Sequence, residues 1–307
     1  MLPEPMEQLR RARVDGGAFF QPQRLLLRLS GSDAFRYLNG QITRDLGRMA
    51  TGHAVQACIL TPKGKLCAPL VIWRENDDLI VESDLSLEET LIARLERYIV
   101  ADDVSVSVEP EHSKSPTIHL FGKLAESEPW VSAPGIRVNR LGTMGFDLNQ
   151  DFPGVASLMT LDPCHVETLR VERAIPKWGS ELSEETLPSE AGLDRTHIDY
   201  DRGCYPGQEV ISRLKSIGRV NRLLSLLAAP ENSTLAPGHE IVTKEEDVVG
   251  KITSVAPRLP EESELPVVSV ALAYLKRAAA EGDAPLFALD PLTRGKTPLS
   301  ITQVTGS

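Results

Sequence analysis

The stretch from Asp199 to Arg219, DYDRGCYPGQEVISRLKSIGR, holds the residues whose types and spacing best suit chemistry. Pro206 suits the first turn of a helix, which would leave Cys204 just ahead of the helix N-terminus. At such a position the free N–H groups and the helix dipole stabilise a thiolate, and Arg202 adds a nearby positive charge. These residues predict a reactive thiol at Cys204. The alternative, on residue types alone, is a small buried apolar side chain.

The residues around Cys204 suit a ligand site as well as a helix. Gly203 and Gly207 let the backbone approach a ligand or adopt a positive φ. Glu209 has the charge that the first turn of a helix favours. An unusual density of cations follows, formed by Arg213, Lys215, Arg219 and Arg222. These cations either make a solvated helix face or bind the carboxylates of an anionic ligand.

Several common functional sites are missing from the sequence. There is no GxGxxG after a strand, no GxxxxGK[ST] and no GxSxG, which disfavours nucleotide-dependent and ordinary hydrolase chemistry. The cysteines form neither a CxxC pair nor a Cys/His cluster at zinc spacing, so we expect no disulfide framework and no metal site. They are Cys58, Cys67, Cys164 and Cys204. A net charge of −10 opposes direct binding to nucleic acid or to an anionic membrane.

The chain carries no segment that reads as a leader or a membrane anchor. Its first twenty residues, MLPEPMEQLRRARVDGGAFF, lack an uninterrupted apolar region, and no later run approaches the roughly 18 apolar residues of a membrane span. We therefore expect a cytoplasmic protein, or a mitochondrial-matrix protein if the source is eukaryotic, with no membrane partner.

The first third of the chain mixes strand and helix patterns. RLLLRLSG, DDLIVES and VSVSVEP read as strands. A short helix is expected after Ser32 as its cap, ending at Gly40. A second helix is expected from a capping box of Ser86 and Glu89. This irregular interleaving favours an α+β fold over a doubly wound sheet.

From residue 222 the pattern changes to short apolar runs split by Gly, Pro and charge, which is typical of a small β-barrel. The tail from DPLTRGKTPLS is expected to extend along the surface. We therefore predict three parts: an N-terminal α+β portion over 1–110, a second α+β portion over 111–221 that ends in the cysteine segment, and a C-terminal β-barrel domain over 222–307.

The cysteine segment RGCYPGQE resembles the K-G-C-[FY]-x-G-Q-E signature of the YgfZ-type folate-binding proteins, relatives of the glycine-cleavage T-protein, an aminomethyltransferase. Three further stretches match the family in order: LRLSGSDAFRYLNGQITRDL, RVERAIPKWGSELSEETLPSEAGL, and VVGKITSVAPRL with VALAYL. The resemblance implies two α+β portions and a C-terminal β-barrel around a central tetrahydrofolate site. The residues that match the signature are Arg202, Gly203, Cys204, Tyr205, Gly207, Gln208 and Glu209.

The resemblance also implies folate contacts. Glu190 in TLPSEAGL matches a T-protein glutamate that holds the pteridine ring, and a carboxylate can accept two parallel N–H bonds from that ring's edge. Glu172 in LRVER is a second acidic candidate. Arg219, with Lys215, resembles the basic stretch that lies against the benzoyl-glutamate end of folate.

Two departures from the family pattern bear on function. The leading lysine of the signature is Arg202 here, which keeps the charge but not the ammonium geometry. The T-protein carries an aspartate pair after its GG turn, whereas Cys67, Ala68 and Pro69 occupy the matching stretch here. Without a carboxylate there, no side chain of this stretch can act as a general acid or base at the folate nitrogen. This disfavours a true aminomethyltransferase.

Three functions follow from the resemblance. The first is a tetrahydrofolate-binding, YgfZ-like protein that supports iron–sulfur cluster assembly or repair in client proteins through Cys204, with indirect effects on tRNA modification. The second is a folate-dependent transferase of the aminomethyltransferase class, for which the sequence offers Asp77 and Asp78 downstream, although they look like a turn between strands. The third is a noncatalytic folate-binding interaction module with a structural Cys204. One cysteine cannot hold a cluster alone, so the proximity of Cys58 or Cys67 matters.

Overall fold

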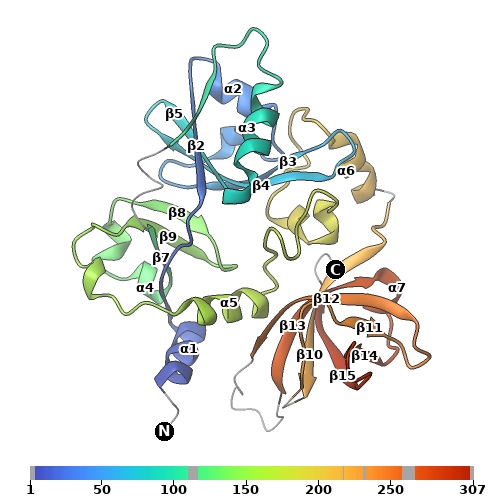
Figure 1. Ribbon diagram of the computed structural model, residues 1–307. Coiled ribbons are helices and arrows are strands. Elements are labelled where there is room, and N and C mark those ends of the chain that lie inside the picture. The colour runs from blue at the N-terminus through green and yellow to red at the C-terminus, as the bar shows by residue number, and fades with distance from the viewer. Residues whose placement is uncertain (1–3, 110–116, 217, 231–232, 258–266, 305–307) are drawn as a thin grey trace. The chain divides into compact units, whose positions relative to one another are not determined.

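The computed structural model describes residues 4–109, 117–216, 218–230, 233–257 and 267–304 (Figure 1). The helices of this part of the chain are α1 (Glu4–Val14), α2 (Ala34–Asn39), α3 (Glu88–Glu96), α4 (Lys123–Glu126), α5 (Pro163–Glu172), α6 (Gln208–Ser216) and α7 (Arg277–Ala280). The strands of the first half are β1 (Gly16–Phe20), β2 (Leu25–Ser30), β3 (Val55–Leu60), β4 (Leu66–Glu75), β5 (Asp78–Ser83), β6 (Ser105–Val108), β7 (Thr117–Gly122), β8 (Ile136–Asn139) and β9 (Met144–Asn149). Those of the second half are β10 (Arg222–Pro230), β11 (Glu240–Val242), β12 (Val248–Pro257), β13 (Val267–Lys276), β14 (Leu286–Leu289) and β15 (Lys296–Val304).

The chain folds into two compact units, each built from separate stretches of sequence. Unit 1 comprises residues 1–10, 163–193 and 214–307, and unit 2 comprises residues 11–162 and 194–213. The three predicted parts do not correspond one to one to these units, and the three-part division stays a prediction. Antiparallel sheets with short helices, followed by a barrel, confirm the predicted α+β fold class.

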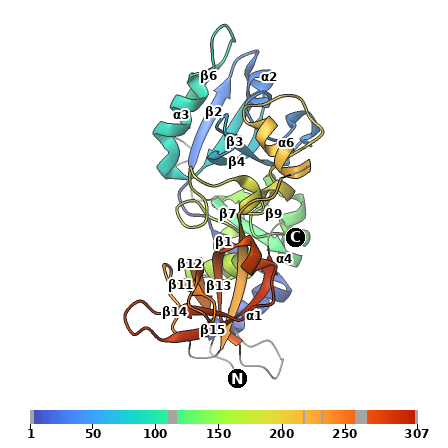
Figure 2. The same cartoon turned by 90° about the vertical axis from the view of Figure 1, so that its right-hand side faces the viewer.

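Unit 2 holds a five-stranded antiparallel sheet in the order β3-β4-β5-β2-β6. Its strands form where apolar residues alternate: Leu25, Leu27 and Leu29 of β2 are fully buried while the residues between them are not. The predicted strands at β2, β5 and β6 are confirmed. Helices α2 and α3 pack against this sheet, as the two views of the ribbon show (Figures 1 and 2).

Both predicted helix caps in this region are wrong. The N-cap of α2 is Asp33, and the Ser32 hydroxyl donates instead to the Asp103 carboxylate, 2.9 Å away. The N-cap of α3 is Leu87, without a side-chain cap, because Ser86 donates to Asp84 at 2.7 Å. In both cases a nearby carboxylate is a stronger partner for the serine than a helix amide. The predicted end of α2 at Gly40 is confirmed.

A second sheet of unit 2 has the order β1-β7-β9-β8, so the N-terminal strand β1 pairs with β7 far along the chain. One face of this sheet is covered by an apolar cluster that includes Ile118, Leu120 and Trp130. The two sheets of unit 2 are tied by backbone and side-chain hydrogen bonds. Ala54 N–H donates to the Arg137 carbonyl at 2.8 Å, and the Gln56 amide donates to the Asn139 carbonyl at 2.9 Å.

Unit 1 contains a closed barrel in the order β10-β13-β12-β11-β14-β15, which confirms the predicted barrel (Figure 1). The tail prediction is wrong in part, because Lys296–Val304 forms β15 and pairs with both β14 and β10. Helix α5 packs on the outside of the barrel through Val171. No helix among the described residues has the length and apolar character needed to cross a membrane.

Candidate functional site

Cys204 lies on the loop that leads into α6, and its side chain is exposed. This exposure rules out the buried alternative considered from the sequence. Pro206 was expected in the first helical turn, but it lies in the turn before α6, which begins at Gln208. Gly207 makes that turn with a φ of +85°, and a Cβ there would lie 2.5 Å from the Thr61 carbonyl oxygen. The backbone of the loop therefore requires glycine at 207.

The loop before Cys204 is pinned to the segment that follows α2. Thr43 is the centre of this attachment: its hydroxyl donates to the His197 carbonyl at 2.6 Å, and its carbonyl accepts from Asp199 N–H at 3.0 Å. Arg202 adds further bonds from its guanidinium to carbonyl oxygens of the same segment, including that of Ile42 at 3.1 Å. The signature segment, Arg202–Glu209, is thus presented on a fixed base within unit 2.

The other cysteines of unit 2 differ sharply from Cys204. Cys58 on β3 is fully buried, and its backbone N–H donates to the Thr43 hydroxyl at 2.8 Å. Burial raises the pKa of the Cys58 thiol to about 12, so this thiol is inert at neutral pH. Cys67 on β4 is partly exposed. In the described part of the chain, no group of metal-binding side chains includes Cys204, so a multi-ligand site there is not supported.

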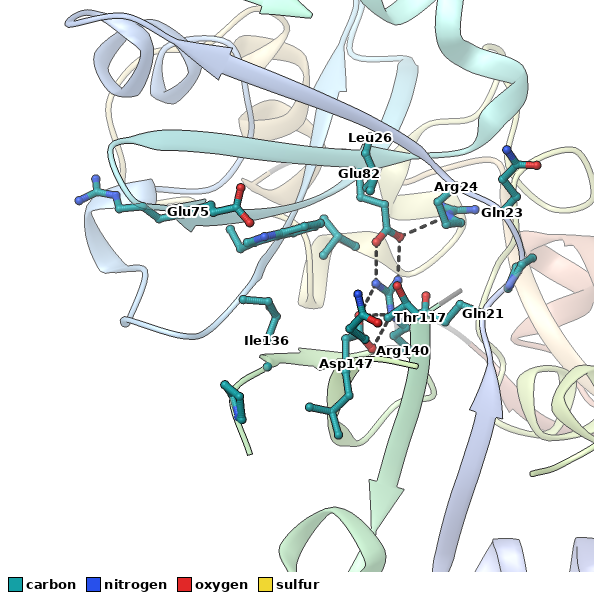
Figure 3. A pocket seen from close by; sticks show the side chains of 18 residues that line it. Gln21, Gln23, Arg24, Leu26, Glu75, Glu82, Thr117, Ile136, Arg140 and Asp147 are labelled. Carbon is teal, nitrogen blue, oxygen red and sulfur yellow. Dashed lines mark hydrogen bonds and ion pairs between the residues drawn. The ribbon is translucent and has the colours of Figure 1, made fainter. Parts of the chain in front are cut away.

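A pocket of about 580 Å³ lies in unit 2, lined by residues from both of its sheets (Figure 3). Ligand pockets commonly measure roughly 300–1,000 Å³, so this volume suits a cofactor-sized molecule. The apolar lining includes Leu26, Val71, Trp73 and Ile136. The polar lining includes Gln21, Gln23, Arg24, Glu75, Glu82, Thr117, Arg140, Asp147 and Asn149.

Arg140 is the centre of a buried charge network in this pocket. Its two Nη atoms donate to the two carboxylate oxygens of Glu82 at 2.7 and 2.6 Å, and its Nε donates to Asp147 at 2.9 Å. Figure 3 shows Arg140 between these two carboxylates. Arg24 also donates to Glu82, at 3.2 Å. The network makes this part of the pocket wall rigid and nearly neutral.

The charge network extends behind the pocket to a buried histidine. His119 is fully buried and its Nδ1 lies 2.7 Å from the Asp147 carboxylate. Burial alone would raise the pKa of Asp147, but Arg140 and His119 outweigh it and lower that pKa to about 2. Burial lowers the pKa of His119 despite the hydrogen bond to Asp147, so the imidazole is neutral near pH 7.

The local sequence patterns did not predict this pocket. Its residues come from separate strands, and none belongs to a recognisable motif. The one available signal was the alternation on β4 that places Val71, Trp73 and Glu75 on one face. The matching stretch for the T-protein aspartates also lies on β4, where Ala68 is buried, and residues 66–70 offer no carboxylate.

The four predicted folate contacts all lie in unit 1. Glu190 is buried in the short 3₁₀ helix Pro188–Glu190, where its Oε2 accepts from Arg222 Nε at 3.0 Å and from Leu187 N–H at 3.4 Å. Arg222 also lies over the Tyr274 ring, 4.4 Å from its centroid. Glu172 ends α5, Lys215 is exposed on α6, and Arg219 is exposed after it. Among the predicted cations, Arg222 is thus a hydrogen-bond partner of Glu190.

No family model matches the chain. Curated relatives do: a tRNA-modifying protein YgfZ of Shigella sonnei is 25% identical over 243 residues, which cover 71% of this chain and 74% of that protein. The protein of the same name from Escherichia fergusonii is 23% identical over 248 residues, with the same coverage. The resemblance to YgfZ-type proteins is confirmed.

The solved structures extend this likeness from sequence to fold. The glycine cleavage system aminomethyltransferase T of Bartonella henselae superimposes with a TM-score of 0.78, covering 99% of this chain and 89% of that one at 15% identity. At this low identity, the similarity is evidence for the fold alone. The chain therefore combines a sequence similar to YgfZ proteins with the fold of the T-protein, as predicted. The name of the relatives connects YgfZ proteins with tRNA modification.

Proposed function

We propose that this protein binds tetrahydrofolate or a folate derivative and supports the assembly or repair of iron–sulfur clusters in cytoplasmic client proteins through the thiol of Cys204. Its effect on tRNA modification is then indirect, through clients that carry clusters. The observation that carries the proposal is the exposed thiol of Cys204 on a loop fixed by hydrogen bonds, within a segment that resembles the YgfZ signature. An exposed cysteine on an ordered loop is available to a macromolecular partner, whereas a buried one is not.

Two features support folate as the ligand. The pocket of unit 2 has the volume of a cofactor site and combines an indole and aliphatic side chains, suited to a flat heterocycle, with carboxylate and guanidinium groups at its wall. Glu190 in unit 1 is the second feature. Its Oε2 is held by Arg222 and Leu187, whereas among the described residues no partner donates to its Oε1. That oxygen can accept an N–H of a pteridine.

The ligand claim is tested by titrating tetrahydrofolate into the protein in a calorimeter. We expect binding by the wild type and unchanged affinity in Cys204→Ser. Glu190→Gln keeps the shape of the side chain but removes its negative charge. It should weaken the affinity for tetrahydrofolate by about tenfold, the loss expected when a hydrogen bond to a charged group is lost. Trp73→Ala tests the pocket of unit 2 separately. Absence of binding by the wild type would contradict the ligand claim.

Three further residues in unit 1 are part of the proposed folate contacts. Glu172→Gln tests the second carboxylate, and the pair Lys215→Ala and Arg219→Ala tests the cations proposed to bind the benzoyl-glutamate end. Because the cations are exposed, we expect their loss to weaken binding more at low salt than at high salt. If all these variants bind tetrahydrofolate with the affinity of the wild type, the residues do not contact folate. That result would not contradict folate binding itself.

The thiol claim needs an assay in cells that lack the protein. Activity of a cluster-containing enzyme should be restored by the wild type and not by Cys204→Ser. Cys164→Ser is the matched control, because Cys164 is also a free, exposed cysteine but lies outside the signature segment. Equal restoration by both variants would refute a functional role for the Cys204 thiol and favour a noncatalytic folate-binding module.

The alternative function is a folate-dependent transferase of the aminomethyltransferase class, which the fold likeness to an aminomethyltransferase favours. Against it stands β4, where residues 66–70 offer no carboxylate to assist proton transfer at the folate. Asp78 bonds to Arg28 at 2.9 Å and is thereby committed to an ion pair. Transfer of a one-carbon unit to tetrahydrofolate by the purified wild type would establish this alternative.

A further inference from the structure

The guanidinium of Arg202 binds four backbone carbonyl oxygens. Its Nη atoms donate to the carbonyls of Asn39, Ile42 and Arg44, and its Nε donates to the Gly203 carbonyl at 3.0 Å. The same group lies over the ring of the buried Tyr205, 5.4 Å from the centroid. Arg202 thus joins the two residues on either side of Cys204 to a segment some 160 positions earlier in the chain.

The bonded carbonyls explain why a cation is stable at this position. Asn39 is the last residue of α2, and the last carbonyls of a helix have no partner within it. A positive charge at that end also interacts favourably with the helix dipole. Arg202 therefore supplies hydrogen bonds to carbonyls of α2 and the following turn. The same bonds hold the backbone of Arg202 beside α2.

The bonding pattern depends on the shape of arginine as well as on its charge. A guanidinium has five N–H donors in a rigid plane, whereas a lysine ammonium has three on a flexible stem and lacks the Nε–H that reaches Gly203. The family signature has lysine at this position, so the four-carbonyl arrangement is a feature of this chain rather than of the signature.

The space around the neighbouring backbone is open. A Cβ built on Gly203 would meet no atom within 4 Å, and the residue does not have a positive φ. Neither packing nor backbone conformation requires glycine there. The loop is therefore anchored by Arg202 and Tyr205, while the side chain of Cys204 between them is exposed.

We propose that Arg202 is a positioning residue that fixes the Cys204 thiol in one orientation by binding the carbonyls of Asn39, Ile42, Arg44 and Gly203. The importance of this positioning for clients rests on the proposed function. The positioning itself is a property of unit 2 alone and is measured without folate, clusters or clients.

The test uses a nitroxide spin label on Cys204 in the full chain, with Cys67 and Cys164 replaced by serine so that Cys204 is the labelled thiol. The electron paramagnetic resonance spectrum of the label should show restricted motion with Arg202 present. Arg202→Lys, which keeps the charge, and Arg202→Gln, which removes it, should both give a fast-moving component. Arg36→Lys is the matched control, because Arg36 lies on α2 but donates to the carboxylates of Asp33 and Asp102, which are outside the loop, and it should leave the spectrum unchanged.

Amide hydrogen exchange provides the second readout. The N–H groups of Gln208 and Asp199 are bonded within the loop and to Thr43, respectively. We expect them to exchange about tenfold or more faster in Arg202→Lys, as for loss of hydrogen bonds to a charged group. Exchange in the barrel of unit 1 should not change, which separates local release from failure to fold.

Identical spectra and exchange rates in wild type, Arg202→Lys and Arg202→Gln would overturn the positioning role. A spectrum that changes in Arg202→Gln alone would also overturn it, because charge rather than the forked geometry would then hold the loop. These outcomes are independent of the proposed function, whose failure would instead show as full restoration of client activity by Cys204→Ser.

Discussion

Arg140 and Glu82 form a bidentate ion pair, in which Nη1 donates to Oε1 at 2.7 Å and Nη2 donates to Oε2 at 2.6 Å. Glu82 belongs to β5 of the five-stranded sheet, whereas Arg140 lies between β8 and β9 of the four-stranded sheet. The pair therefore ties the two sheets of unit 2 at the wall of its pocket. Pocket shape and unit stability depend on the same side chains.

Arg140→Met should strongly destabilise the protein, because it removes the guanidinium that bonds to both buried carboxylates and leaves Glu82 with Arg24 and Asp147 with His119. We expect a loss of about 3–5 kcal/mol in the free energy of unfolding, measured by urea denaturation. Arg36→Met is the control. Arg36 also pairs with two carboxylates, Asp33 and Asp102, but it is exposed to solvent, so its loss should lower the free energy of unfolding far less than the loss of Arg140. Equal effects of the two substitutions would refute the structural importance of the Arg140 network.

Asp147 should make stability depend on acid pH. Its pKa in the folded protein is lowered to about 2, against an ordinary value of 3.8, so the unfolded chain binds the proton more tightly. The resulting stabilisation is complete above about pH 5 and is lost as the pH falls from there through 2. Its size is on the order of 2 kcal/mol. Asp147→Asn should flatten the stability curve over this acid range, and an unchanged slope would contradict the assignment.

Two glycines of the signature segment should respond in opposite ways to alanine. Gly207→Ala places a Cβ 2.5 Å from the Thr61 carbonyl oxygen at a φ of +85°, and should lower stability by at least about 1–3 kcal/mol. Gly203→Ala meets no atom within 4 Å, and should leave stability unchanged or raise it by up to about 1 kcal/mol through the unfolded state. Thermal melting of both variants measures the difference. A destabilised Gly203→Ala would show that the loop is packed more tightly than described.

The cysteines of unit 2 should differ in their reaction with iodoacetamide at neutral pH. Cys204 is exposed, whereas Cys58 is fully buried and its pKa is raised to about 12 by burial. We expect rapid labelling of Cys204 in the native protein and labelling of Cys58 only after denaturation. Mass spectrometry of the digested protein resolves the two sites. Labelling of Cys58 without denaturant would indicate local opening between β3 and the Thr43 segment.

Local sequence patterns predicted the elements whose side chains alternate or recur regularly. The alternating leucines of β2 and the apolar runs of the barrel are examples, because burial on one face leaves a direct trace in sequence. The capping residues were predicted wrongly at Ser32 and Ser86, since Asp103 and Asp84 compete for the hydroxyls. Asp103 lies 71 positions from Ser32, and such competition is invisible to a local pattern.

The candidate site also contains some features that local sequence patterns predicted and others that they did not. The position of Cys204 just before a helix followed from local residue types and is confirmed by the start of α6 at Gln208. The partners of Arg202 are backbone carbonyls, which every residue carries, so the sequence contains no signal for them. The network of Glu82, Arg140 and Asp147 depends on how two sheets pack, and its members are 58 and 7 positions apart. Only tertiary structure brings such residues together.

The most direct test of the central claim is the rate of Cys204 alkylation as a function of pH, followed by peptide mass spectrometry with and without tetrahydrofolate, with Cys204→Ser as the blank. A functional thiol at a folate site predicts labelling at neutral pH that slows when tetrahydrofolate is bound, while labelling of the exposed Cys164 is unaffected. A Cys204 that does not react at neutral pH, or whose rate is the same with and without tetrahydrofolate, would contradict the account and leave the fold likeness standing by itself.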